Sequence, residues 1–139
     1  NYFILYGMAL TGKAEYESAR EQFIHVIQNK KGKIHRENNK KAYRGIALTY
    51  YKEGIYDQAK AYFELALDTD ALSYMNNDLS AYCAECEMYL GEYSKAVKIY
   101  SKLIEDEKID KNKIDVPIVA TVSFASSVLA IKVTIKNNI

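Results

Sequence analysis

A pattern built around one alanine recurs three times along this 139-residue chain. In each copy a Tyr stands three positions before the Ala, and a Phe or Tyr stands four positions after it. The local sequences are AEYESAREQF, GIYDQAKAYF and GEYSKAVKIY, which contain Ala19, Ala59 and Ala96. Spacings of three and four residues place side chains on one face of an α-helix. The pattern therefore predicts three equivalent helices.

A second, weaker pattern lies upstream of each of these helices. Phe3, Tyr6, Gly7 and Leu10 correspond to Tyr43, Ile46, Ala47 and Tyr50, and Ser80, Cys83, Ala84 and Glu87 form a degenerate third copy. Ala14, Gly54 and Gly91 fall at the same place between the two patterns, and Gly54 suits a left-handed or tight turn. Each unit is thus predicted to be a helix, a tight turn and a second helix, with small residues where the two helices approach closely.

This arrangement resembles the tetratricopeptide repeat (TPR) family, whose pattern ends in Ala-x-x-x-Phe and then Pro in about 34 residues. The closing Pro is absent from every copy, and the alanines are 40 and then 37 residues apart. We expect the extra residues in the connections 29–39 and 69–77, because insertions there cost little. The resemblance implies an all-α fold: a right-handed superhelix of antiparallel helix pairs, an α–α solenoid, with a C-terminal capping helix.

The expected boundaries follow from these patterns. Helices are predicted over residues 1–12, 15–28, 40–52, 56–69, 77–90 and 93–106. They form three repeats within residues 1–110, at about 1–33, 40–73 and 77–110, and residues 111–139 form a connection and an apolar C-terminal capping helix. Residues 107–115 are polar and are expected to be a connection. Asp115 can cap a following helix, and Pro117 suits its first turn.

The apolar tail over residues 116–135 leaves three interpretations open. It can be a capping helix, whose Ile118, Val122 and Leu129 would cover helix 93–106. It can also be an edge that pairs with a further repeat or another copy, giving a homo-oligomer through residues 116–135, because contiguous apolar surface marks interfaces. Membrane contact is the third interpretation. The uncharged run Ile118–Ile131 has 14 residues, which is short of the roughly 18 to 20 that a span needs.

Charge and motifs argue against several classes of function. Lys and Arg total 19 and Asp and Glu total 18, so a net charge of +1 gives no global attraction to nucleic acid or anionic membrane. The basic stretch from Lys30 to Lys41, which includes Lys40, is expected to be a solvated loop. The sequence contains no Gly-rich phosphate loop, HExxH or EF-hand. His25, in helix 15–28, and His35, in a loop, lack a neighbouring nucleophile. We therefore expect no catalysis and no cofactor.

The two cysteines, Cys83 and Cys86, form a CxxC within a predicted helix. A zinc site would need two further ligands, and a redox CxxC normally opens a helix after a strand. We interpret these thiols as core packing, with a redox or metal role as the alternative. Free thiols slightly favour a cytoplasmic location, which the sequence otherwise leaves open.

The resemblance also implies where a partner binds. In this family the first helix of each pair lines a concave face, so residues of that helix not needed in the core line a groove. The expected groove residues are Met8, Lys41, Arg44, Leu48, Tyr51, Tyr82, Glu85 and Tyr89, and family position adds Ile4, Thr11, Lys52, Asp78, Ala81 and Met88. Lys41 and Arg44 can hold a carboxylate, and tyrosine rings suit recognition. Alternatively, the tyrosine rings pack between helices.

These observations predict a non-catalytic protein–protein interaction module that binds a peptide or helix of a partner. A TPR subclass that clamps C-terminal carboxylates uses Lys and Asn at positions where this chain has Ile4 and Met8, so that function is not implied. The alternative is a structural repeat segment of a larger protein that self-associates through its apolar tail. A nucleic-acid-binding helical repeat is disfavoured by the charge balance.

Overall fold

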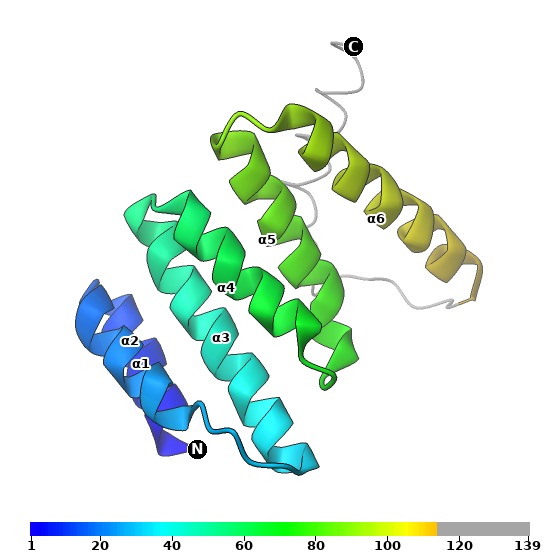
Figure 1. Cartoon of the computed structure of the whole chain (residues 1–139). Coiled ribbons are helices and arrows are strands. Elements are labelled where there is room, and N and C mark those ends of the chain that lie inside the picture. Colours follow the sequence, from blue (N-terminus) through cyan, green and yellow to red (C-terminus); the bar gives the residue numbers. More distant parts are fainter. Residues whose placement is uncertain (114–139) are drawn as a thin grey trace.

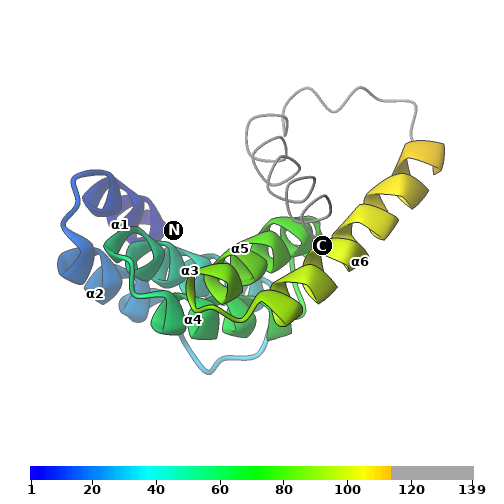
Figure 2. The same ribbon diagram turned by 90° about the horizontal axis from the view of Figure 1, so that it is seen from above.

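The computed structural model describes the backbone of residues 1–113 and the side chains of residues 1–107, and this part of the chain is all α-helical (Figure 1). The helices are α1 (Tyr2–Gly12), α2 (Tyr16–Val26), α3 (Lys33–Glu53), α4 (Tyr56–Asp68), α5 (Asn76–Tyr89) and α6 (Tyr93–Lys113). A 3-10 turn, η1 (Ser73–Met75), precedes α5. Each helix packs against the next in antiparallel fashion, and α1 also contacts α3. Seen from above, α1, α3 and α5 lie along one side, opposite α2 and α4 (Figure 2).

The turn within each helix pair has the same backbone conformation. Ala14, Gly54 and Gly91 have φ values of 61°, 78° and 79°. After each of these turns, a backbone N–H donates to the carbonyl five residues earlier: Glu15 to Leu10, Ile55 to Tyr50, and Glu92 to Glu87. These bonds satisfy carbonyls at the end of the first helix. The expected equivalence of the three turns is therefore confirmed, including the position occupied by an alanine.

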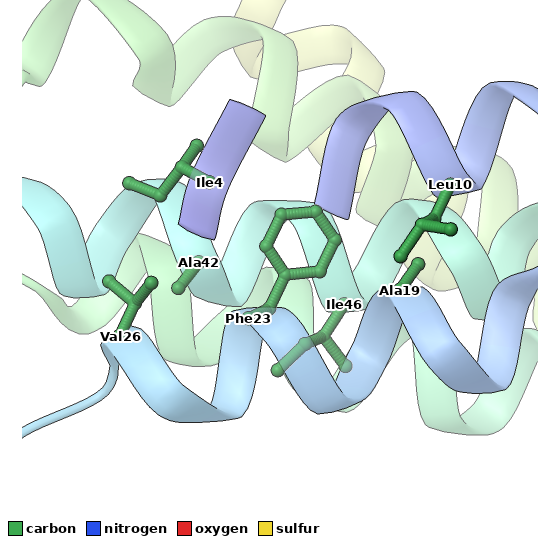
Figure 3. Close-up of a cluster of buried hydrophobic side chains, with 7 residues drawn as sticks. All are labelled: Ile4, Leu10, Ala19, Phe23, Val26, Ala42 and Ile46. Carbon is green, nitrogen blue, oxygen red and sulfur yellow. The ribbon is translucent and has the colours of Figure 1, made fainter. Parts of the chain in front are cut away.

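The repeated alanine and aromatic residues form the core. Ala19, Ala59 and Ala96 are fully buried, and Phe23, Phe63 and Tyr100 are at most 2% exposed. Phe23 lies within a cluster of side chains from α1, α2 and α3 (Figure 3). Ala47 and Ala84 are also fully buried, as expected where helices approach closely. Apolar burial of this kind is the main driving force that holds such helix pairs together.

Two of the predicted connections are wrong. Helix α3 begins at Lys33, so residues 33–39, including His35, extend the helix where a loop was expected. Helix α6 continues to Lys113 through most of the predicted connection 107–115. Residues 107–113 contain three Lys and one Glu, and residues 33–39 contain Lys33, Arg36 and Glu37; these residue types favour helix even without an apolar stripe. The extra residues of the first repeat therefore lengthen a helix, and the connection between α2 and α3 is short.

Lys40 is another correction, because this residue of the expected solvated loop is fully buried. Its Nζ donates to Asn76 Oδ1 at 2.6 Å and to the Thr69 carbonyl at 3.2 Å. Desolvation lowers the pKa of Lys40. The ammonium thus links α3 to Thr69, which follows α4, and to the first residue of α5. Buried charges require such partners.

The predicted capping helix, its Asp115 cap and the interface or membrane interpretations of residues 116–135 lie outside the described residues. Within residues 1–113, no helix combines the length and the apolar character needed to cross a bilayer.

Candidate partner-binding groove

A groove of about 560 Å³ opens between α1, α3 and the start of α5. Its lining residues are Ile4, Leu5, Met8, Thr11, Gly12, Phe23, Lys41, Arg44, Gly45, Leu48, Lys52, Tyr74, Met75 and Asp78. Aliphatic, thioether and aromatic side chains provide most of this surface. Ligand pockets of this size are usually apolar and contain a few polar groups. This groove has that composition.

Three basic residues of α3 line the groove: Lys41, Arg44 and Lys52. Spacings of three and eight residues bring them to one face of the helix. Lys41 and Lys52 are exposed and Arg44 is half-buried. Within the described side chains, none of the three forms an ion pair with a carboxylate. Asp78 is the one acidic residue among the described lining residues, so the groove carries excess positive charge.

The predicted site residues divide into two groups. Met8, Lys41, Arg44 and Leu48 line the groove, as do Ile4, Thr11, Lys52 and Asp78 of the wider set. Tyr51, Tyr82, Glu85 and Tyr89 are not among its lining residues. Ala81 and Met88 instead pack toward α6 with Ala96 and Tyr100. Four of the eight principal residues thus line this groove, and the other four lie outside its lining.

The second group forms a cluster of tyrosines between α3, α4 and α5. The Tyr51 hydroxyl donates a hydrogen bond to the Glu85 carboxylate, and its ring meets the Tyr82 ring edge-on with centroids 5.3 Å apart. Desolvation and the Glu85 carboxylate raise the pKa of Tyr51, which keeps this hydroxyl protonated as the donor. Tyr51 and Tyr82 therefore follow the alternative interpretation, in which the rings pack between helices.

Tyr89 lies at the edge of the same cluster. It is 57% exposed, and one face of its ring stacks on Tyr56 with centroids 4.2 Å apart. Its other face is the part available to a ligand. A partner in the groove would need to extend beyond the described lining residues to reach it.

Tyr74 and Met75 are groove residues that the sequence did not indicate. They belong to η1, within the expected connection 69–77, where no periodic pattern marks a structured turn. η1 lies directly before α5, and both residues share the groove lining with residues of α1. Leu5, Phe23 and Gly45 also contribute to the lining, because the groove reaches down to the aromatic ring that separates α1 from α3.

The cysteines take no part in this groove. Cys83 and Cys86 are buried and free, and desolvation raises the pKa of each thiol to about 12. In the described part of the chain, no group of three or more His, Cys, Asp or Glu side chains is placed to hold a metal ion. Burial and high pKa favour the packing interpretation.

No protein-family model matches this chain, and no curated protein matches it significantly.

Proposed function

We propose that this chain is a non-catalytic protein-interaction module that binds an extended segment or a short helix of a partner in the groove. The observation that supports it is the combination of an apolar floor with Lys41, Arg44 and Lys52, which have no carboxylate partner among the described side chains. The proposal includes a TPR-like, right-handed superhelix of the helix pairs. The three equivalent turns and the repeated buried aromatic residues support that finer description.

The groove favours a partner segment with apolar side chains flanked by acidic ones. Met8 and Met75 adapt to irregular apolar shapes, and Leu48 adds aliphatic surface. Arg44 can bind a carboxylate through two parallel hydrogen bonds, whereas Lys41 and Lys52 act as point charges. Because much of the attraction is electrostatic, binding should weaken as salt is raised.

Two peptide libraries test this proposal, one acidic and one basic, with equal length and equal apolar content. We expect the whole chain to bind members of the acidic library, measured by fluorescence anisotropy. The variant Lys41→Glu/Arg44→Glu should bind them at least about 10-fold more weakly, because it reverses the charge that holds the carboxylates.

The matched control is Lys30→Glu/Lys31→Glu, which makes the same change in net charge on exposed residues of the connection between α2 and α3. It should retain most of the binding. An equal loss in both variants would mean that net charge alone attracts the peptides, and no binding to either library would contradict the groove assignment.

The second candidate function is a structural segment that serves assembly. The exposed apolar side of α1 favours it, since Tyr2, Leu5 and Tyr6 are 89%, 60% and 55% exposed. The expected contribution of the tail to self-association concerns residues outside the described part of the chain. Light scattering measures whether the whole chain and residues 1–115 differ in oligomeric state. If both proteins are monomers, self-association through the tail is excluded.

A further inference from the structure

One part of the groove lining comes from a connection between helices. The segment Thr69–Asn76, which we call the η1 loop, runs from the residue after α4 to the first residue of α5, and its Tyr74 and Met75 line the groove. None of the loop residues is buried. Met75 packs against the core between α4 and α5 but is only half-buried. Apolar burial therefore does little to fix this part of the groove, and polar contacts must do more.

These polar contacts come from α3. The Nζ of Lys40 donates to the Thr69 carbonyl at 3.2 Å and to Asn76 Oδ1 at 2.6 Å. The two acceptors belong to the first and the last residue of the η1 loop, so a single ammonium closes the loop at its base. One helical turn earlier, Nε of Arg36 donates to the Asp70 carbonyl at 3.3 Å. Two cations of α3, four residues apart on one helix face, thus hold the loop.

The η1 loop contains a backbone conformation that its surroundings must maintain. Leu72 has φ 44° and ψ 52°, in the left-handed region that residues with a bulky side chain rarely adopt. Its carbonyl accepts the Met75 N–H at 2.9 Å, so Leu72 directs the chain into η1. Strain of this kind persists only where neighbouring contacts fix the backbone. Lys40 supplies such contacts at both ends of the loop.

A lysine at position 40 has a cost that packing alone does not explain. Lys40 is fully buried, and the ammonium loses its hydration there. An aliphatic side chain would fill the same space at a lower cost, but it has no N–H groups for the two ends of the loop. Arg44, one turn further along the same face of α3, lines the groove. Helix α3 thus connects the base of the η1 loop to the charged part of the groove.

We propose that Lys40 is a positioning residue of the groove. By closing the η1 loop at its base, it keeps Tyr74 and Met75 in the lining, where they favour a bulky apolar side chain of the partner over a small one. This inference rests on the proposed function and adds the feature of the partner that the loop recognises. The basic residues of α3 bind the acidic side chains of the same segment.

Amide hydrogen exchange of the whole chain tests the loop without a partner. In Lys40→Met the side chain keeps its length but loses both hydrogen bonds, so the η1 loop should open more often. We expect the Met75 N–H, which donates to the Leu72 carbonyl, to exchange at least about 10-fold faster by NMR. The Gly91 N–H, in the turn between α5 and α6, should exchange as before. An unchanged rate at Met75 would overturn the proposal.

Peptide binding tests the discrimination between apolar side chains. The probes are the tightest-binding member of the acidic library and the same peptide with alanine at its bulky apolar positions. The unaltered chain should prefer the first peptide at least about 10-fold. Lys40→Met should reduce this preference to about 3-fold or less. The salt dependence of binding should stay the same, because the basic groove residues are intact. An equal loss of affinity for both peptides would indicate a general structural defect and overturn the proposal.

Two further variants separate the loop from overall stability. Tyr74→Ala removes a ring that is 77% exposed, so it should reduce the same preference in a chain that remains folded. Lys60→Met is the matched control, because it also removes a partly buried ammonium, which pairs with Glu87, and Lys60 is not among the described lining residues. It should leave the exchange of Met75 and the peptide preference unchanged.

The outcomes distinguish this inference from the proposed function. If Lys60→Met acts like Lys40→Met, general destabilisation explains both variants and the positioning role is overturned. If the unaltered chain binds neither peptide, the proposed function is contradicted together with the discrimination. If the chain binds the peptides and Lys40→Met changes neither the exchange nor the preference, only the role of Lys40 is contradicted.

Discussion

The contact of α2 with α3 and that of α4 with α5 use one helix arrangement with different side chains. At the first contact, the Phe23 ring is wedged against glycines: a Cβ added at Gly7 or Gly45 would lie 2.7 or 2.5 Å from it. At the second, Phe63 stacks on Tyr82, with ring centroids 4.9 Å apart. Gly45 and Tyr82 occupy equivalent positions. The same site thus accommodates an aromatic ring either by close approach of backbone or by stacking.

The polar contacts beside these rings also differ between the two helix contacts. The guanidinium of Arg20 lies 4.2 Å above the Tyr50 ring and contacts Glu53 Oε1 at 3.1 Å. At the equivalent place, Lys60 forms an ion pair with Glu87 at 2.8 Å. Glu87 is 4% exposed, and its Oε2 has no hydrogen-bond partner among the described residues. The second contact therefore depends more strongly on its single cation.

Removing the shared rings should have the largest effect. We expect Phe23→Ala and Phe63→Ala each to lower the free energy of unfolding by about 3 to 5 kcal/mol. Phe63→Ala should cost more, by about 1 kcal/mol, because stacking on Tyr82 is also lost. Urea unfolding followed by circular dichroism measures both. An equal cost at the two positions would contradict the difference between wedging and stacking.

Replacing Lys60 or Arg20 by an uncharged residue should have the next-largest effect on stability. Lys60→Met should lower the free energy of unfolding by about 2 to 3 kcal/mol, because it leaves Glu87 buried without a counter-charge. Arg20→Met should cost only about 1 kcal/mol, since Glu53 can be hydrated at the surface. The comparison is again by urea unfolding at neutral pH. The opposite order would show that the cation–π contact of Arg20 is the stronger one.

Gly45→Ala tests the close approach directly. We expect a loss of about 1 to 3 kcal/mol from overpacking against Phe23, even though alanine favours helix. Gly12→Ala is the control, because a Cβ there meets nothing within 4 Å, and it should be neutral or stabilising by up to about 1 kcal/mol. Thermal unfolding distinguishes them. A stabilising Gly45→Ala would show that the Phe23 ring can move aside.

Substitutions in the turns should change the free energy of unfolding less, and one of them should raise it. Ala14→Gly should raise the free energy of unfolding by about 1 kcal/mol, because alanine at a φ of 61° is strained and glycine is not. Gly54→Ala should lower it by a similar amount. Differential scanning calorimetry of the two variants checks the signs. No change at either position would mean that the turns relax around the substituted residue.

The contact of α4 with α5 contains two buried thiols, whereas the cluster between α2 and α3 contains none. The two contacts should therefore respond differently to high pH. Cys83 and Cys86 stand where α3 has Ile46 and Thr49, and their pKa is raised to about 12. Unfolded thiols ionise near pH 9 and folded ones do not, so their stabilising effect is lost between about pH 9 and 12. At pH 8, a disulfide reagent should label the native thiols at least about 100-fold more slowly than the unfolded ones. Comparable rates would show that this helix contact opens readily.

The alanine and aromatic pattern sufficed to predict six helices, their tight turns and the buried rings, because both signals are local. The start of α3 was missed because Lys33–Asn39 has helix-forming residues without an apolar stripe. Burial of Lys40 depends on Thr69 and Asn76, whose positions are set only when α4 and α5 pack. Met8, Lys41, Arg44 and Leu48, which helix position indicates, line the groove, and their binding of a partner stays a prediction. Tyr51 and Tyr82 pack on rings far away in the sequence, which helix position does not reveal.

The ring of Phe23 contacts residues of two helix pairs at once, and this has an evolutionary consequence. A bulky residue at position 45, such as the tyrosine at position 82, is compatible with the fold only if the ring at position 23 shifts from a wedge to a stack. A change at position 45 or at position 23 that occurs without the other would destabilise the fold. In divergent descendants of this chain, the residues at positions 7, 23 and 45 should therefore change together, while the alanines beside them, at positions 19 and 42, can stay fixed.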